Sequence, residues 1–342
     1  MHSPIIKDFA GYIDPLNAKA TPFKNVQTVA GYCYRRIDGT PSIKPAHDLP
    51  VGEGQEHHRR GMDFVIRHAP NGIRETSGPV YMGAAGFINL GYIAKSRARA
   101  AILFDINPTQ RLLWGAVLDA LRNSDTREEF LTAFRRLPFT LEENIKALNA
   151  QAGFSTHKVL DGVSAVNVIR NCYKELTSFP DGRPGYRPDF NLDDFGLEKE
   201  GDFWHLKALA EQNALGVLTM DIKDPFARIY LQRALVQATG RGHVDVLYLS
   251  NILPYIARDG ATEDFSGVAN RNGAQSYESM LNNIVALTHN GSLVVTYREF
   301  INSHPAIPAM LAHARQATYI DPEPTPTLSR NTFRDKRGRE PA

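Results

Sequence analysis

One stretch of the chain, residues 79–114, constrains the fold more than any other. A short apolar run at 80–82 enters a glycine turn at 83–86. A helix-compatible segment follows, and a second apolar run at 100–104 ends on Asp105. This order is typical of a strand, a turn, a helix and a second strand parallel to the first, because parallel neighbours need a helical crossover.

The same alternation resumes later in the chain. Three more strand-like runs, separated by helical patterns, cover residues 215–220, 243–249 and 292–297. Five strands alternating with helices predict an α/β protein with a doubly wound, mostly parallel, Rossmann-like sheet and helices on both faces.

The remaining segments suggest additions to this sheet. Residues 1–76 are rich in proline, glycine and charge, and 41–61 show no periodicity, so we expect an N-terminal arm or lid. Residues 77–320 are expected to form the Rossmann-like domain, with a mostly helical insertion at 124–207. The proline-rich, polar residues 321–342 predict a disordered tail.

Composition limits the classes of protein to consider. The 342 residues are 42% hydrophobic and 22% charged, with a net charge of +2, which gives no strong field toward nucleic acid or a membrane surface. No apolar run approaches the roughly 20 residues that span a bilayer, and the N-terminus lacks a signal-peptide pattern. With just two cysteines, we expect a cytoplasmic protein, whose oligomeric state the sequence leaves open.

The glycine turn and Asp105 are the first candidate site. Ligands of open parallel sheets bind beyond the carboxyl ends of the strands, where small turn residues let backbone N–H groups approach. An acidic residue about 20 positions on can accept hydrogen bonds from ribose hydroxyls. Asp105 could equally cap the helix that follows. The turn residues are Gly83, Ala84, Ala85 and Gly86.

The order of elements resembles the class I S-adenosylmethionine-dependent methyltransferase fold. The resemblance implies S-adenosylmethionine as cofactor, with the turn at 83–86 near its methionine part and Asp105 holding its ribose. It also implies Asp221 at the adenine amino group and Ser250 with Asn251 lining the methyl-transfer path. Asn251 could instead be a simple turn residue.

The phrases YMGAAGFINLGYIA, ILFDI and YLSNI also resemble a bacterial group of methyltransferase-like proteins. That group has an Asn after the glycine turn, which implies a cofactor contact for Asn89. The chain also departs from the family. Tyr81 stands where an acidic residue is common, the turn is GAAG rather than GxGxG, and the fourth strand leads into SNILPY.

Two further side chains have competing interpretations. His205, beside Trp204, could be a general base or a packed surface histidine. Asp221 could bind the cofactor, since Asp224 before Pro225 is an equally good helix cap. No HExxH motif or Cys/His cluster points to a catalytic metal, and no GxxxxGK[ST] motif points to a P-loop.

These patterns leave three hypotheses. The first is an S-adenosylmethionine-dependent methyltransferase acting on a small molecule or a protein side chain. The second is a non-catalytic relative that binds S-adenosylmethionine or another nucleoside as a sensor or scaffold, motivated by Tyr81 and the altered turn. The third is a dinucleotide-dependent oxidoreductase, which the missing GxGxxG spacing disfavours.

Overall fold

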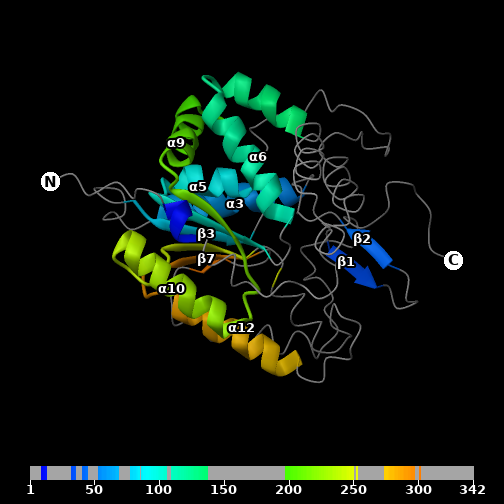
Figure 1. The fold of residues 1–342 in the computed structure, drawn as a ribbon, viewed down its shortest axis with the longest axis vertical. Helices are drawn as coiled ribbons and strands as arrows, with labels where there is room; N and C mark the ends of the chain where they lie inside the picture. The colour runs from blue at the N-terminus through cyan, green and yellow to red at the C-terminus, as the bar shows by residue number, and fades with distance from the viewer. Residues whose placement is uncertain are drawn as a thin grey trace, which may run out of the picture.

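The structure is a computed structural model. It describes residues 9–13, 32–35, 41–44, 53–68, 78–84, 86–105, 109–137, 197–249, 252, 273–296 and 300–301. Its centre is a six-stranded sheet in the order β5-β4-β3-β6-β7-β8, with helices packed on both faces (Figure 1). The strands are β3 (Val80–Ala84), β4 (Ala100–Asp105), β5 (Leu215–Thr219), β6 (Val246–Tyr248), β7 (Leu293–Val295) and β8 (Phe300–Ile301).

Five of these strands are parallel, which confirms the predicted doubly wound α/β fold. The sixth strand, β8, runs antiparallel to β7, and Val295 pairs with Phe300. A two-residue strand is too short to show any alternation, so no pattern predicts it. The sheet therefore ends in a reversed edge strand.

The helices divide between the two faces of the sheet. On one face lie α3 (Glu53–His68), α5 (Asn89–Ser96), α6 (Thr109–Asn123) and α9 (Glu200–Glu211); on the other lie α10 (Pro225–Thr239) and α12 (Gly273–Leu287) (Figure 1). Alternating strand residues feed both cores. Tyr81 and Leu103 enter the first core, whereas Met82 and Ile102 enter the second. Strands buried on both faces explain the continuous apolar runs in the sequence.

The N-terminal arm contains more structure than expected. The lack of periodicity over 41–61 predicted a loop, and this is wrong where α3 begins at Glu53. The first half of α3 is polar, and its buried apolar positions, Met62, Phe64 and Val65, lie too near its end to reveal the helix. α3 packs against α5, and a short antiparallel pair, β1 (Tyr32–Arg35) and β2 (Pro41–Lys44), precedes it.

The expected insertion is described in part. A helix over 127–137 places Phe130 and Phe134 in the core, and α9 forms the crossover into β5. Residues 138–196 and the expected tail at 321–342 lie outside the described residues. In the described part of the chain, none of the helices has the length and apolar character needed to cross a membrane.

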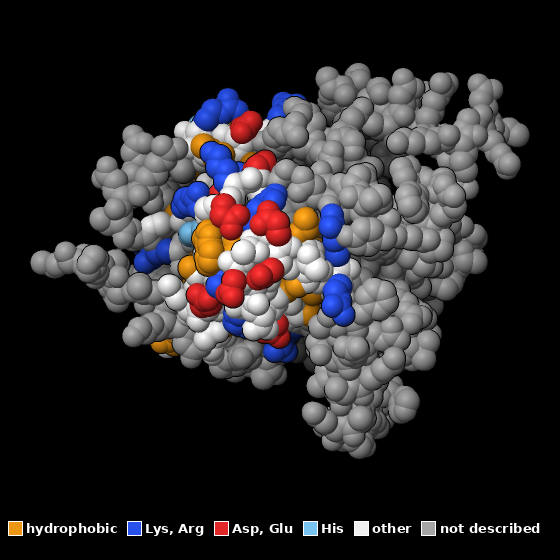
Figure 2. Space-filling model, turned by 90° about the horizontal axis from the view of Figure 1, so that it is seen from above, with side chains coloured by type: hydrophobic (Ala, Val, Ile, Leu, Met, Phe, Trp, Pro, Cys, Tyr) orange, Lys and Arg blue, Asp and Glu red, His pale blue; other side chains and the backbone are white. Residues whose placement is uncertain are grey.

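Charged side chains of both signs cover the surface above α6 and α9. In the view from above, acidic side chains gather at the centre of the described face and Lys and Arg lie among and around them (Figure 2). Among the exposed acids, Asp125 and Glu128 follow α6 in the sequence and Glu211 ends α9. Over the described part of this face, acidic and basic side chains are therefore mixed.

Candidate functional site

The carboxyl edge of the sheet brings the turn and Asp105 together. Ala84, the last residue of β3, pairs with Phe104 in β4, so Asp105 lies one position beyond it on the neighbouring strand. Asp105 also pairs with Thr219 at the end of β5. Its side chain is 9% exposed. The register thus places Asp105 one residue beyond the end of β3, at the edge where the turn begins.

The space over Gly83 is filled by the protein itself. A Cβ at Gly83 would lie 1.9 Å from Asn89 Oδ1 and 2.6 Å from the Tyr81 hydroxyl. The Tyr81 hydroxyl donates a hydrogen bond to Asn89 Oδ1, with 2.5 Å between the two oxygens. Burial raises the pKa of this phenol well above its ordinary value, so it stays protonated and remains a donor. The glycine makes room for Asn89.

Asn89 fastens the turn from inside. Its amide nitrogen donates to the carbonyls of Ala84 at 2.6 Å and Gly86 at 2.7 Å, and the side chain is fully buried. The amide oxygen and both amide N–H groups of Asn89 thus make hydrogen bonds within the protein. Gly86 is half-buried, and Ala85 lies outside the described residues. Of the turn residues described, Gly86 is the one that is not fully buried.

The helix α5, which follows the glycine turn, begins without a capping side chain. Ile88 occupies the N-cap of α5 and makes no side-chain capping hydrogen bond, and the first turn of the helix contains no acidic residue. The positive end of a helix favours a carboxylate or a phosphate. The sequence around α5 therefore does not neutralise this end with a charge of its own.

Asp221 follows β5 at the same edge. Its Oδ1 accepts a hydrogen bond from the backbone N–H of Lys223 at 2.9 Å, and its Oδ2 lies 3.6 Å from Lys223 Nζ. Asp224 caps α10 by accepting from the backbone N–H of Phe226 at 2.8 Å. The helix cap is thus supplied by Asp224, which leaves the partly exposed Asp221 at the edge. Ser250 and Asn251 lie outside the described residues.

His205 is at the other end of the sheet. It lies on α9 and hydrogen-bonds to the backbone of Ala98, two residues before β4 begins. Burial, followed by the positive charge of Arg97, lowers the pKa of His205. Its Nε2 is buried and has no hydrogen-bond partner among the described residues. The structure therefore does not bring His205 together with Gly86 and Asp105.

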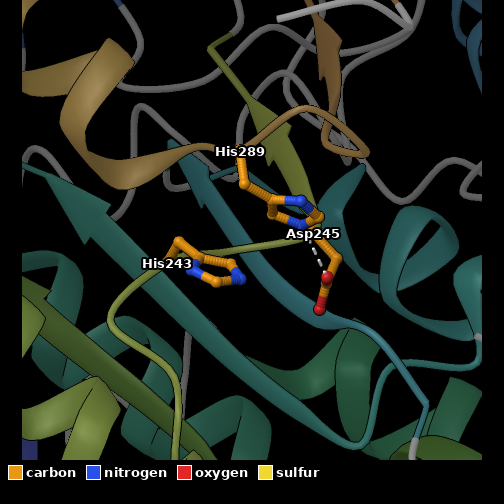
Figure 3. A group of neighbouring side chains, drawn as sticks. All are labelled: His243, Asp245 and His289. Atoms are coloured by element: carbon orange, nitrogen blue, oxygen red, sulfur yellow. Dashed lines mark hydrogen bonds and ion pairs between the residues drawn. The ribbon is translucent and has the colours of Figure 1, made fainter.

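A second polar cluster lies at this amino edge, before β6 and β7. The side chains of His243, Asp245 and His289 point toward one another (Figure 3), and one donor atom from each lies within 4.8 Å of the others. The two imidazole rings have centroids 4.2 Å apart. Burial, and then the neighbouring His289, lower the pKa of His243.

Asp245 is the centre of this cluster. Its Oδ1 lies 2.9 Å from His289 Nε2 and 3.6 Å from Arg241 Nη1, and its Oδ2 accepts the backbone N–H of Val80 at 2.8 Å. The backbone N–H of Gly291 donates to His289 Nδ1 at 3.1 Å. His289 therefore carries its proton on Nε2 and donates it to Asp245.

Sequence reasoning missed this cluster, although a signal was present. His243 and Asp245 stand two apart just before β6, so in the strand that the sequence predicts over 243–249 they would share a face. His289 follows α12, immediately before the neighbouring strand β7. A His-x-Asp pair entering one strand and a histidine entering the next would have predicted their meeting, but only with the strand order known.

Comparisons with known proteins add a family but no activity. A family model described as "Domain of unknown function (DUF7790)" matches residues 69–267, which is more than half of the chain and spans β3 to β6. The comparison with curated proteins finds no match.

Proposed function

The chain belongs to the DUF7790 family of unknown function, and we propose that it binds S-adenosylmethionine at the carboxyl edge of its sheet and transfers the methyl group. The observation that carries this proposal is the place of Asp105, at the carboxyl end of β4 and beside the turn after β3. A carboxylate there can accept hydrogen bonds from both hydroxyls of a ribose.

The topology supports a ligand at this position. β3 pairs with β4 on one side and with β6 on the other, and the crossover helices change face at this point. α5 covers one face of the sheet, whereas α10 covers the other. In open α/β sheets, ligands bind outside the carboxyl ends of the strands where the winding reverses.

The fit of the cofactor rests on part of the predicted set. The side chain of Asn89 fills the space over Gly83. We therefore propose that the cofactor approaches the backbone at Gly86 and that Asp105 binds its ribose. The uncapped start of α5 would favour the carboxylate of the methionine part. Asp221 would accept from the adenine amino group, and Ser250 with Asn251 would orient the acceptor. His205 is not part of this proposal.

S-adenosylmethionine, when bound, supplies a methyl group on a sulfonium that an acceptor displaces in line. The contribution of the protein to such a step is largely orientation of the two reactants. The acceptor is proposed to be a small molecule or a protein side chain. A cytoplasmic location, in keeping with two cysteines in 342 residues, is part of the proposal.

A non-catalytic S-adenosylmethionine-binding sensor or scaffold is the second candidate. The hydrogen bond between Tyr81 and Asn89 favours it, because the two side chains fill the space over Gly83. Tyr81 also stands where class I methyltransferases commonly have an acidic residue. Dinucleotide-dependent oxidation is less well supported. A full dinucleotide sheet has two βαβαβ halves, whereas here the antiparallel β8 interrupts the second.

Calorimetric titration of the full chain with S-adenosylmethionine, S-adenosylhomocysteine and NAD tests these alternatives. Binding of both sulfur compounds is expected, and Asp105→Ala should weaken it by about 1.5–3 kcal/mol. Asp119→Asn, a change at an exposed carboxylate on α6, is the matched control and should leave the affinity unchanged. Wild-type affinity in Asp105→Ala, or binding of NAD alone, would overturn the proposal. Methyl turnover with a panel of acceptors then separates the enzyme from the sensor.

A further inference from the structure

The cluster of His243, Asp245 and His289 provides three donors suited to a metal ion. It offers two imidazole nitrogens and one carboxylate oxygen within 4.8 Å of one another, and the three side chains converge (Figure 3). Nitrogen donors combined with one carboxylate suit Zn²⁺, whereas Ca²⁺ and Mg²⁺ take oxygen ligands. The donor chemistry therefore selects a transition metal.

His243 is the donor that the fold leaves available. Among the described residues, neither of its ring nitrogens makes a hydrogen bond, and its ring lies against that of His289. Asp245 is 1% exposed, but both histidines are only partly buried. An ion can thus reach the carboxylate from the side of the two rings without opening the core.

We propose that His243, Asp245 and His289 form a Zn²⁺ site at the amino edge of the sheet, with a water molecule as the fourth ligand. The site is separate from the proposed nucleotide site, which lies at the carboxyl edge. It joins the segment entering β6 to the turn between α12 and β7. Its role is to fix these two connections, since three protein ligands come from two segments distant in sequence.

Small movements would bring the donors into coordination geometry. Tetrahedral ligands at Zn–N and Zn–O distances of about 2.0–2.1 Å lie about 3.3 Å apart. His289 Nε2 and Asp245 Oδ1, now 2.9 Å apart, must separate by a few tenths of an ångström. The donor atom of His243 must approach them, which a rotation of its partly exposed side chain can provide.

The tautomer of His289 sets the cost of binding. A zinc ion on Nε2 displaces the proton there, and the neutral ring then carries its proton on Nδ1. That nitrogen now accepts from the backbone N–H of Gly291, so this hydrogen bond must be given up. The cost is this hydrogen bond and the one between His289 Nε2 and Asp245 Oδ1, which together are small beside the binding free energy of zinc at sites of this kind.

Arg241 is the charge that opposes the ion most directly. Its Nη1 lies 3.6 Å from Asp245 Oδ1, and its side chain is 46% exposed, so it can move into solvent. The charge of Arg99 also acts on this region, although its Nη2 is engaged with the carbonyl of Thr239. Removing the positive charge at Arg241 should therefore strengthen binding.

The test uses the full chain, purified without a polyhistidine tag and stripped of metal. Isothermal titration with Zn²⁺ should give one site per chain, and Co²⁺ should give the visible absorption of a four-coordinate ion. His243→Ala should weaken Zn²⁺ binding by about tenfold or more, since loss even of a group that only orients a ligand costs about 10–100-fold. Arg241→Gln should strengthen binding several-fold.

His68→Ala removes a surface histidine outside the cluster and is the matched control, with affinity expected to equal that of the wild type. Zn²⁺ should also raise the melting temperature of the wild type and of Arg241→Gln by more than it raises that of His243→Ala. Absence of a stoichiometric site in the wild type overturns the proposal. So does a His243→Ala protein that binds Zn²⁺ as tightly as the wild type.

Discussion

Val80 and Asp245 are joined by two hydrogen bonds that cross the point where the sheet reverses its winding. The backbone N–H of Asp245 donates to the Val80 carbonyl at 2.9 Å, and the backbone N–H of Val80 donates to Asp245 Oδ2 at 2.8 Å. Asp245 thus extends the pairing of β3 with β6 by one rung through its side chain. Its other oxygen faces His289.

Asp245→Asn should destabilise the protein by about 1–3 kcal/mol although the shape of the side chain is kept. The new amide group would face the N–H of His289 as a second donor, and the opposite tautomer would place Nδ1–H against Gly291 N–H. Urea unfolding measures the change. Arg241→Gln, which removes a half-exposed partner, should cost about 1 kcal/mol or less. Equal costs in the two variants would contradict the central role of the carboxylate.

Gly83→Ala should destabilise the protein by about 1–3 kcal/mol, because the new Cβ would overlap Asn89 Oδ1. Gly115→Ala in α6 is the control: nothing lies within 4 Å of the new Cβ, and alanine is the better helix former.

The contact itself can be isolated by a double-mutant cycle. In an Asn89→Ala background the space over Gly83 is vacated, so Gly83→Ala should cost less than it does in the wild type. If Gly83→Ala lowers the unfolding free energy equally in the two backgrounds, overlap with Asn89 is not the reason that position 83 requires glycine.

Lys207→Met should destabilise the protein by about 1–3 kcal/mol. The ammonium of Lys207 donates to the carbonyls of Arg122 and Ser124, each at 2.8 Å, and so caps the end of α6. Methionine keeps the apolar stem but leaves both carbonyls without this donor. Lys199→Met, at an exposed position where α9 begins, should change the unfolding free energy by no more than about 0.5 kcal/mol.

His205 should make the protein less stable in mild acid. Burial lowers the pKa of His205 in the folded state below its ordinary value of about 6.5. The unfolded chain therefore takes up this proton first, and stability is lost as the pH falls through about 6.5 toward the folded pKa. His205→Asn keeps a donor for the Ala98 carbonyl but does not titrate. Its unfolding free energy should fall less steeply with acid, and a slope equal to that of the wild type would remove His205 as a cause.

Continuous apolar runs and clear helix boundaries explain why most of the sheet was predictable. The apolar runs of β3 and β4 are buried on both faces, and α10 has a proline at its start and a glycine after its end. The helix α3 was missed because its first half offers no apolar face, and β8 because two residues show no pattern. Local signals fail where packing from elsewhere in the chain determines the element.

Of the candidate site, the residues at strand ends were predictable, whereas the directions of its side chains were not. Asp105 is at the predicted edge because the last residue of a parallel strand always lies there. The burial of Asn89 against Gly83 depends on a side-chain direction that spacing does not determine. His205 was assigned by its neighbour in the sequence, whereas the direction of α9 places it near Ala98.

The bonds from Asn89 to the carbonyls of Ala84 and Gly86 have a kinetic consequence. Both carbonyls already accept hydrogen bonds from a buried amide. A ligand that binds beside Asp105 therefore contacts backbone that is already ordered, and little conformational entropy is lost on binding. Association should then follow a single exponential whose rate rises linearly with ligand concentration, without the plateau that a slow rearrangement would impose.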